Sequence, residues 1–311
     1  MTDRPIVITG AAGLVGQNLI VRLKARGYTR LTGIDKHPVN TAILARLHPD
    51  ITVIEADLAA PGPWARAFAG AATLVQAHAQ IGGPDIAPFN ANNITATKHV
   101  LSAARAAGVS HIVHLSSSVV NSAAVDFYTE TKKAQESLTA ACPIKQVVLR
   151  PTLMFGWFDR KHLGWLARFM RRIPVFPIPG DGKYLRQPLY VGDFCNIIIA
   201  CIEGERTGAY NISGLQTVDY IDLIAAVRRA SRARTVIVPI PFWLFRVLLS
   251  AYGLIDRNPP FTPKQLAALA TPDVFEVIDW PGIFGVTPTA LDAALAETFQ
   301  AQPYAAVELA F

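Results

Sequence analysis

A glycine-rich turn near the start of the chain constrains the fold more than any other feature. A short apolar run, Ile6–Thr9, leads into Gly10-Ala11-Ala12-Gly13-Leu14-Val15-Gly16, and an amphipathic stretch follows. A strand, a glycine turn and a helix N-terminus in this order form an anion site, because the free N–H groups of the first helical turn and the helix dipole attract a pyrophosphate. The pattern therefore predicts a dinucleotide-binding unit.

Each part of the turn has its own expected task. Gly10 permits the tight turn, Gly13 lets the backbone approach the phosphates, and Gly16 lets the helix pack closely on the strand. Leu14 and Val15 belong to the first helical turn, whose N–H groups face the anion. We expect these five residues to bind the cofactor.

A carboxylate after the second apolar run indicates which dinucleotide is bound. Leu31–Ile34 ends in Asp35, which follows the glycines by about twenty residues, where an acid bonds the ribose hydroxyls and disfavours a 2′-phosphate. We therefore predict NAD as the cofactor. The cationic neighbours Lys36 and His37 weaken this preference, and the alternative is that Asp35 only ends a strand.

Composition predicts a globular protein that does not bind nucleic acid. The chain has 311 residues, of which 51% are hydrophobic and 17% charged, with a formal net charge of +6. Single-stranded nucleic acid requires basic residues interleaved with aromatic ones, and no such tract is present. The densest basic groupings are Arg168, Arg171, Arg172 and Arg228, Arg229, Arg232, Arg234.

The three cysteines, Cys142, Cys195 and Cys201, have no metal-ligand spacing, so we expect no metal and a reducing, cytoplasmic location. Cys195 and Cys201 are expected in the core. The chain enters its first strand at once, which argues against a signal peptide, and no apolar run reaches membrane-spanning length.

Alternating strand-like and helix-like runs predict an α/β fold with a Rossmann-like, doubly wound parallel sheet. We expect a dinucleotide-binding domain over residues 1–151 and a smaller mixed substrate region over 152–311, part of which returns to the sheet. The expected strands are Ile6–Thr9, Leu31–Ile34, Thr52–Glu55, Thr73–Ala77, His111–Leu115 and Gln146–Leu149. The expected helices include Leu14–Ala25, Asn93–Ala107, Tyr128–Ala140, Val218–Ser231 and Pro263–Leu269.

Tyr128 and Lys132 are the candidate catalytic pair. Four residues apart on a helix, they share one face, and an ammonium beside the phenol is expected to lower the phenol's pKa. They follow a strand that ends in Ser116-Ser117-Ser118, where a serine can hold a substrate oxygen. The pattern predicts proton exchange with a hydroxyl while hydride moves to or from a nicotinamide. The alternative is two exposed helix residues.

Taken together, these motifs resemble the extended short-chain dehydrogenase/reductases, the NAD-dependent epimerase/dehydratase family. The resemblance covers the first two thirds of the chain well. It implies a Rossmann-like fold, bound NAD, often a nucleotide-sugar substrate, and a homodimer paired through two sheet-flanking helices. The matching segments are Thr9–Gly16, Asp35, Asp57-Leu58, Ser116–Ser118, Tyr128–Lys132, Leu149–Pro151 and Gln187–Asp193.

The resemblance assigns roles to individual residues. The catalytic hydroxyl falls on Ser118, with Ser117 close to the substrate, the general base on Tyr128 and its partner on Lys132, which also reaches the ribose. Asp57 and Leu58 match the surroundings of the adenine. Asn93 and Arg186 match positions near the substrate, although Arg186 reads equally well as an exposed loop residue. His78 is expected beside the nicotinamide ribose, either as a second proton handler or as a packed, hydrogen-bonded residue.

Departures from the family pattern keep the substrate open. Val119-Val120-Asn121-Ser122 replaces the Val-Tyr-Gly turn of sugar-nucleotide epimerases, and the loop before Tyr128 is short. Val119 and Val120 also replace the Asp-Glu pair of dehydratases, so dehydration is the least expected reaction. No clear Arg-x-Gly-Asp segment occurs, and Arg246 and Arg257 are the substitutes considered.

Three functional hypotheses follow. The first is epimerisation or 4-keto reduction of a nucleotide-linked sugar. The second is an NAD-dependent dehydrogenase of an apolar alcohol, resembling a 3β-hydroxysteroid enzyme. The third is a non-catalytic NAD-binding subunit. The segment Pro239–Ile255, rich in Phe, Trp and Leu, is expected to pack in the core, with a lid over the substrate or a membrane-surface helix as alternatives.

Overall fold

The computed structural model describes residues 4–123, 125–255 and 274–310. The expected helix Pro263–Leu269 and the candidate Arg257 lie outside these residues. Within them, no helix combines the length and the apolar character needed to cross a membrane.

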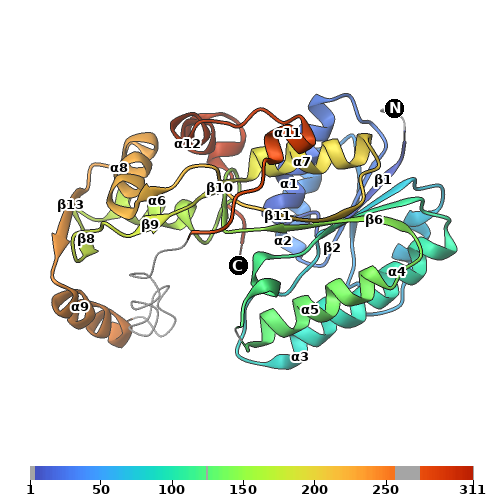
Figure 1. The fold of residues 1–311 in the computed structure, drawn as a ribbon, viewed down its shortest axis with the longest axis horizontal. Coiled ribbons are helices and arrows are strands. Elements are labelled where there is room, and N and C mark those ends of the chain that lie inside the picture. Colours follow the sequence, from blue (N-terminus) through green and yellow to red (C-terminus); the bar gives the residue numbers. More distant parts are fainter. Residues whose placement is uncertain (1–3, 124, 256–273, 311) are drawn as a thin grey trace.

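Seven parallel strands form the central sheet, in the order β11-β6-β5-β4-β1-β2-β3 (Figure 1). The expected α/β fold with a doubly wound parallel sheet is therefore confirmed. The order reverses direction between β1 and β4, which places the ligand crevice outside the carboxyl ends of these strands. The strands are β1 (Ile6–Thr9), β2 (Leu31–Asp35), β3 (Thr52–Glu55), β4 (Thr73–Gln76), β5 (His111–Leu115), β6 (Lys145–Pro151) and β11 (Gly208–Ile212).

Helices cover both faces of this sheet. On one face α1 (Leu14–Ala25) packs against α7 (Val191–Glu203), and α11 (Trp280–Phe284) also contacts α7. On the other face α4 (Ala96–Ala106) packs against α5 (Phe127–Ala140) (Figure 1). Since both faces are covered, strands such as β1 and β5 are buried along their whole length, including His111 and His114 of β5.

Residues beyond the proposed boundary at 151 also build the main sheet. β11 pairs with β6, and α7 packs on α1, so both sides of the boundary share one apolar core. Cys195 and Cys201 lie fully buried in α7, and all three cysteines are free. The division into two domains stays a prediction.

The rest of the chain forms a smaller region around a second apolar core. This core is shared by α6 (Leu163–Arg172), α8 (Tyr220–Ser231) and α12 (Leu291–Gln300). Three two-stranded sheets accompany them. The pairs are β7 (Met154–Phe155) with β10 (Leu189–Tyr190), β9 (Leu185–Arg186) with β12 (Val218–Asp219), and β8 (Val175–Pro179) with β13 (Val236–Ile240).

Arg22 of α1 fastens this smaller region to the main sheet. Its guanidinium donates to the Tyr190 hydroxyl at 2.8 Å and to the Glu297 carboxylate at 2.7 Å, and it lies 5.0 Å from the centre of the Trp157 ring. A side chain at position 192 would collide with both Tyr190 and Arg22, so Gly192 is required there. The glycine of the Gln187–Asp193 motif thus serves packing between the two regions.

The expectation that Pro239–Ile255 packs in the core is wrong for the described side chains. Pro239 and Ile240 end β13, and α9 (Phe242–Ile255) projects from the end of the molecule away from the main sheet (Figure 1). Trp243 is 67% exposed and Val247 is 56% exposed. An apolar composition predicted burial, but the helix rests on β8 by one side only.

Candidate active site

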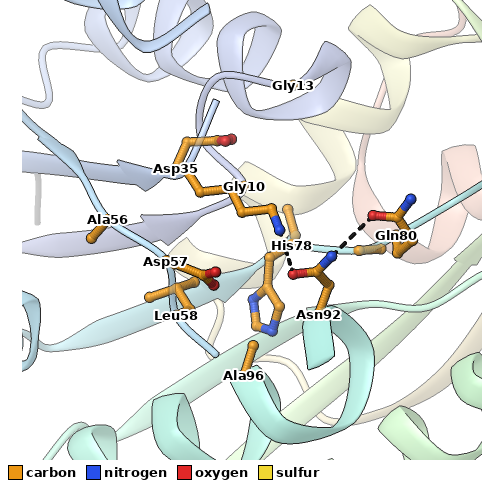
Figure 2. Close-up of a pocket in the computed structure, with 13 residues that line it drawn as sticks. Gly10, Gly13, Asp35, Ala56, Asp57, Leu58, His78, Gln80, Asn92 and Ala96 are labelled. Atoms are coloured by element: carbon orange, nitrogen blue, oxygen red, sulfur yellow. Dashed lines mark hydrogen bonds between the residues drawn. The ribbon is translucent and has the colours of Figure 1, made fainter. Parts of the chain in front are cut away.

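A cleft opens at the carboxyl ends of β1, β2, β3 and β4, where the strand order reverses. The glycine turn forms one wall, and Figure 2 shows the side chains that surround it. Its lining contains most of the cofactor-binding residues predicted from sequence: Gly10, Gly13, Asp35, Asp57, Leu58 and His78, together with Lys36, Ala56, Ala77, Ala79, Gln80, Asn92 and Ala96.

The glycine turn fits a bound pyrophosphate. Gly10 has φ +69°, and a Cβ there would lie 2.7 Å from the Ala77 carbonyl carbon. A Cβ on Gly16 would lie 2.5 Å from the Ala11 carbonyl oxygen, so the helix approaches the turn closely. Around Gly13, by contrast, a Cβ would meet nothing nearer than 3.4 Å, and no side chain caps the helix that begins at Leu14. The turn is therefore open where the anion binds.

Asp35 and Asp57 lie in the cleft at the ends of β2 and β3 (Figure 2). The Asp35 carboxylate accepts hydrogen bonds from the backbone N–H of Ala12 at 3.0 Å and of His37 at 3.1 Å. It thereby ties the glycine turn to β2. Asp57 accepts from the Ala59 N–H at 2.9 Å and is exposed. Both carboxylates are placed where the ribose and adenine of a dinucleotide are expected.

His78 is held on both sides of its ring. Nδ1 lies 2.8 Å from the Thr9 hydroxyl, and Nε2 lies 3.2 Å from the Thr97 hydroxyl. Burial, aided by the charge of Lys132, lowers the pKa of His78 to about 3. The ring is neutral at physiological pH, which fits the packed, hydrogen-bonded alternative rather than a proton handler.

Tyr128 and Lys132 lie one turn apart on α5, but they do not interact as expected. Burial raises the pKa of the Tyr128 phenol, and the opposing influence is a hydrogen bond with Ser117. The Lys132 amine donates to the Leu115 carbonyl at 2.8 Å and to the Gln135 side-chain oxygen at 2.5 Å. The expected lowering of the phenol's pKa by the lysine is therefore wrong.

Lys132 itself carries the larger perturbation. It is only 1% exposed, and burial lowers the pKa of its amine to about 7. Two hydrogen bonds direct the amine toward the end of β5, at the same edge of the sheet as the cofactor cleft. The spacing of four residues correctly predicted that Tyr128 and Lys132 lie on one face of the helix. It could not predict that the Leu115 carbonyl and Gln135 would accept the hydrogen bonds of the amine.

Ser117 and Ser118 differ in their surroundings. Ser117 is buried and hydrogen-bonded to the Tyr128 phenol. Ser118 begins the short 3-10 helix η3 (Ser118–Asn121) and is half-buried. The resemblance placed the catalytic hydroxyl at Ser118 and a substrate contact at Ser117, and both assignments stay predictions.

Glu136 and Gln135 of α5 connect the serine turn after β5 with the neighbouring elements. The sequence analysis did not identify either residue. The Glu136 carboxylate accepts from the Ser116 hydroxyl at 2.6 Å and from Arg150 Nε at 3.1 Å, which joins the serine turn to α5 and β6. Gln135 donates to the His78 carbonyl at 3.1 Å and to the Thr97 hydroxyl at 3.0 Å. Arg150 belongs to the Leu149–Pro151 motif that the sequence analysis identified, but its pairing with Glu136 was not predicted.

Asn93 and Arg186 lie apart from the cleft lining. Asn93 is fully buried in the π-helical turn η2 (Asn90–Thr95), donating to the Gln80 carbonyl at 3.1 Å and to the Thr131 hydroxyl at 2.9 Å. Its bonds join the loop after β4 to α5. The Arg186 guanidinium lies 5.0 Å from the ring centre of Tyr184 and 5.7 Å from that of Tyr220. Their assignment to the substrate stays a prediction.

Comparison with known proteins decides the family. The model of the "NAD dependent epimerase/dehydratase family" matches residues 6–213, more than half of the chain. The chain belongs to this family. It is therefore an NAD-dependent enzyme, and the glycine turn with Asp35 is where this chain fits NAD. Among the described residues, no group of three or more His, Cys, Asp or Glu could hold a metal ion.

Two proteins similar in sequence carry the names of reductases with different substrates. A ceramide reductase of Caulobacter vibrioides is 28% identical over 69% of this chain and 66% of its own length. A chloroplastic divinyl chlorophyllide a 8-vinyl-reductase of Zea mays is 27% identical over 65% of this chain and 52% of its own. The matches thus span less than two thirds of either relative.

A UDP-glucuronic acid 4-epimerase of Bacillus cereus, solved in complex with NAD, shares the fold. Its TM-score is 0.69 at 21% identity, over 94% of this chain and 96% of that chain. At this level of identity the likeness establishes the architecture alone.

Replacing Gly10 by alanine is expected to weaken NAD binding at least about tenfold, because the new Cβ would lie 2.7 Å from the backbone of Ala77 and His78 and would push the glycine turn out of place. Gly108→Ala is the matched control: Gly108 has φ +73° and nothing within 4 Å of a Cβ. Each change costs about 1 kcal/mol of stability through backbone strain, and Gly10→Ala adds the collision with the Ala77 and His78 backbone. Calorimetric titration with NAD measures the difference, and equal affinities of the two variants would contradict the assigned turn.

The pKa of Lys132 predicts a pH-dependent stability. Above about pH 7 the folded protein releases the amine proton, while the unfolded chain keeps it until about pH 10. The free energy of unfolding therefore rises with pH between these values. In NAD-free protein, Lys132→Met should lack this contribution, whereas Lys133→Met, which removes an amine paired with Glu130, should retain it. Urea unfolding at about pH 6 and about pH 9 measures the change in the free energy of unfolding between the two pH values. If this change is the same in Lys132→Met as in the wild type, the prediction is refuted.

Proposed function

We propose that this protein is an NAD-dependent reductase of an apolar ketone, acting reversibly on the corresponding secondary alcohol. The observation that carries the proposal is the contact between Tyr128 and Ser117 at the carboxyl end of β5, beside the cleft for NAD. A phenol and a hydroxyl so placed can bind one substrate oxygen between them.

The chemistry of the phenol favours the reducing direction. Because burial raises its pKa, Tyr128 keeps its proton at neutral pH and acts as an acid. When bound in its reduced form, NAD supplies the hydride for the carbonyl carbon. Ser117 donates a hydrogen bond to the carbonyl oxygen, and Tyr128 transfers its proton to the same oxygen as the alcohol forms. Lys132, with a pKa near 7, is held by the Leu115 carbonyl and by Gln135, and through these bonds it supports the end of β5.

Exposed apolar side chains near Tyr128 and at the carboxyl edge of the sheet support an apolar substrate. Val125 is 88% exposed and Phe127 is 41% exposed, and they lie three residues and one residue before Tyr128. Leu153 follows β6 and Leu215 follows β11, so both stand at the carboxyl edge of the sheet, and both are exposed. Burial of such surface by a substrate is favourable.

The names of the sequence relatives support a reductase. Both are named as reductases, and neither name includes a nucleotide sugar. The short loop between Ser118 and Tyr128 and the valines at 119 and 120 also depart from the sugar-nucleotide pattern. The homodimer and the cytoplasmic location implied earlier stay predictions.

A nucleotide-linked sugar is the second candidate, for epimerisation or 4-keto reduction. The cationic group of Arg186, stacked over Tyr184 and Tyr220, offers a site for a pyrophosphate beside aromatic rings. The solved UDP-glucuronic acid 4-epimerase with a similar fold adds plausibility. The two candidates predict different determinants of substrate affinity. An apolar ketone would depend on exposed apolar side chains such as Phe127, and a nucleotide sugar would depend on Arg186.

The roles of the two serines give a sharp test. We expect Ser117→Ala to lower kcat/KM about 100-fold, close to the effect of Tyr128→Phe, because each removes a group that acts on the substrate oxygen. Ser118→Ala should change kcat/KM by only a few fold. Loss of NADH absorbance on addition of the ketone provides the measurement, with NAD affinity as the control for folding. The reverse ranking of the serines would restore Ser118 as the catalytic hydroxyl.

A panel of substrates separates the two candidates. Long-chain and polycyclic ketones should be reduced, and Phe127→Ser should raise their KM severalfold while Arg186→Gln leaves it unchanged. UDP-, GDP- and dTDP-sugars should neither reduce bound NAD nor be epimerised. Turnover of a nucleotide sugar that depends on Arg186 would overturn the proposal in favour of the second candidate.

A further inference from the structure

The smaller region carries a dense group of arginines where two of its helices end. They occupy the last turns of α6 and α8 and the short segment between α8 and β13. We call them the arginine cluster: Arg171, Arg172, Arg228, Arg229, Arg232 and Arg234. All of them are exposed except Arg228, which is half-buried. The segment between α8 and β13 runs along the edge of the molecule away from the main sheet (Figure 1).

Hydrogen bonds join the two stretches of chain that carry the arginine cluster. The Arg171 guanidinium donates to the Ser231 carbonyl at 3.0 Å, which links the end of α6 to the end of α8. A little further along both stretches, the Val236 N–H donates to the Pro174 carbonyl at 2.9 Å. The arginines that end α6 and those that follow α8 therefore belong to one surface.

The ends of the two helices account for only part of this charge. A cation in the last turn of a helix interacts favourably with the helix dipole. Arg171 and Arg228 also each donate to a backbone carbonyl, and Arg229 lies 3.8 Å from the exposed Asp292 carboxylate. Within the described part of the chain, no ion pair includes the other three members: Arg172, Arg232 and Arg234.

Two exposed valines lie beside these arginines. Val175 and Val236 are the first residues of β8 and β13, and they pair in register. They are 50% and 57% exposed and follow Arg172 and Arg234 by three and two residues. Apolar side chains bordered by polar ones, with arginine enriched, are typical of surfaces that bind proteins.

We propose that the arginine cluster and the two valines dock an acidic segment of a partner protein. A planar guanidinium binds a carboxylate through two parallel hydrogen bonds, so the exposed arginines suit Asp and Glu side chains. Apolar side chains of the same segment cover Val175 and Val236. Opposite charges also speed the encounter and fix the orientation of the partner.

Charge and composition weigh against two other occupants. A second copy of the chain docked through the same surface would bring two arginine clusters together, and like charges repel. Single-stranded nucleic acid stacks its bases on aromatic side chains, and the proposed surface consists of arginine and valine alone. The surface shares no residue with the cleft lining, so the proposal does not depend on the substrate.

Fluorescence anisotropy of a labelled peptide with the full chain tests the proposal. The probe is a helical peptide of Glu, Leu and Ala, and its reference has Gln in place of Glu. The acidic peptide should bind at least about tenfold more tightly than the reference, and high salt should weaken its binding severalfold.

Variants locate the binding on the proposed surface. Arg172→Gln with Arg234→Gln should lower the affinity for the acidic peptide about tenfold. The matched control is Arg46→Gln with Arg105→Gln, which removes exposed arginines from the last turns of α2 (Pro38–Leu47) and α4 and should bind like the wild type.

Three results would overturn the proposal. The first is equal binding of the acidic peptide and its Gln reference. The second is equal affinity of the two double-arginine variants for the acidic peptide, with unchanged NAD affinity confirming that both are folded. The third is tighter binding of duplex DNA or of phosphatidylglycerol vesicles than of the acidic peptide, lost in Arg172→Gln with Arg234→Gln. That result would identify the cluster as a surface for phosphate groups.

Discussion

A buried chain of hydrogen bonds joins the cofactor turn to the catalytic helix, and the geometry of the site depends on it. From Thr9, at the end of β1, the chain passes through His78 and Thr97 to Gln135, and from there to the amine of Lys132. Every member is buried, and an unpaired polar group there would cost about 1–3 kcal/mol. The glycine turn and α5 are therefore fixed relative to each other before any substrate arrives.

This constraint also explains the electrostatics of the catalytic pair. Because Gln135 and the Leu115 carbonyl hold the amine of Lys132, the amine does not stabilise a phenolate on Tyr128. Burial then acts on both groups in the direction of their neutral forms. A neutral phenol beside Ser117 is suited to giving a proton to a carbonyl oxygen, which supports the proposed reduction.

The local features of the fold could be predicted from sequence, and the features that depend on distant contacts could not. The bounds of α1 agree with the expected Leu14–Ala25, because the glycine turn sets where that helix starts. The expected helix from Asn93 instead continues a π-helical turn that begins at Asn90, where Asn93 bonds Gln80 and Thr131. Cleft residues such as Gly10 and Asp35 follow from their spacing. The partner of Tyr128 and the exposure of α9 depend on packing that no local pattern encodes.

The central claim is that Tyr128 remains protonated at neutral pH and acts as an acid. Nuclear magnetic resonance of protein carrying [13C]tyrosine measures this directly, with the Tyr128 Cζ signal assigned by its loss in Tyr128→Phe. We expect this signal to titrate above pH 10.0, the ordinary pKa of a tyrosine. A titration near neutrality would contradict it, because the phenol would then be a base activated by Lys132.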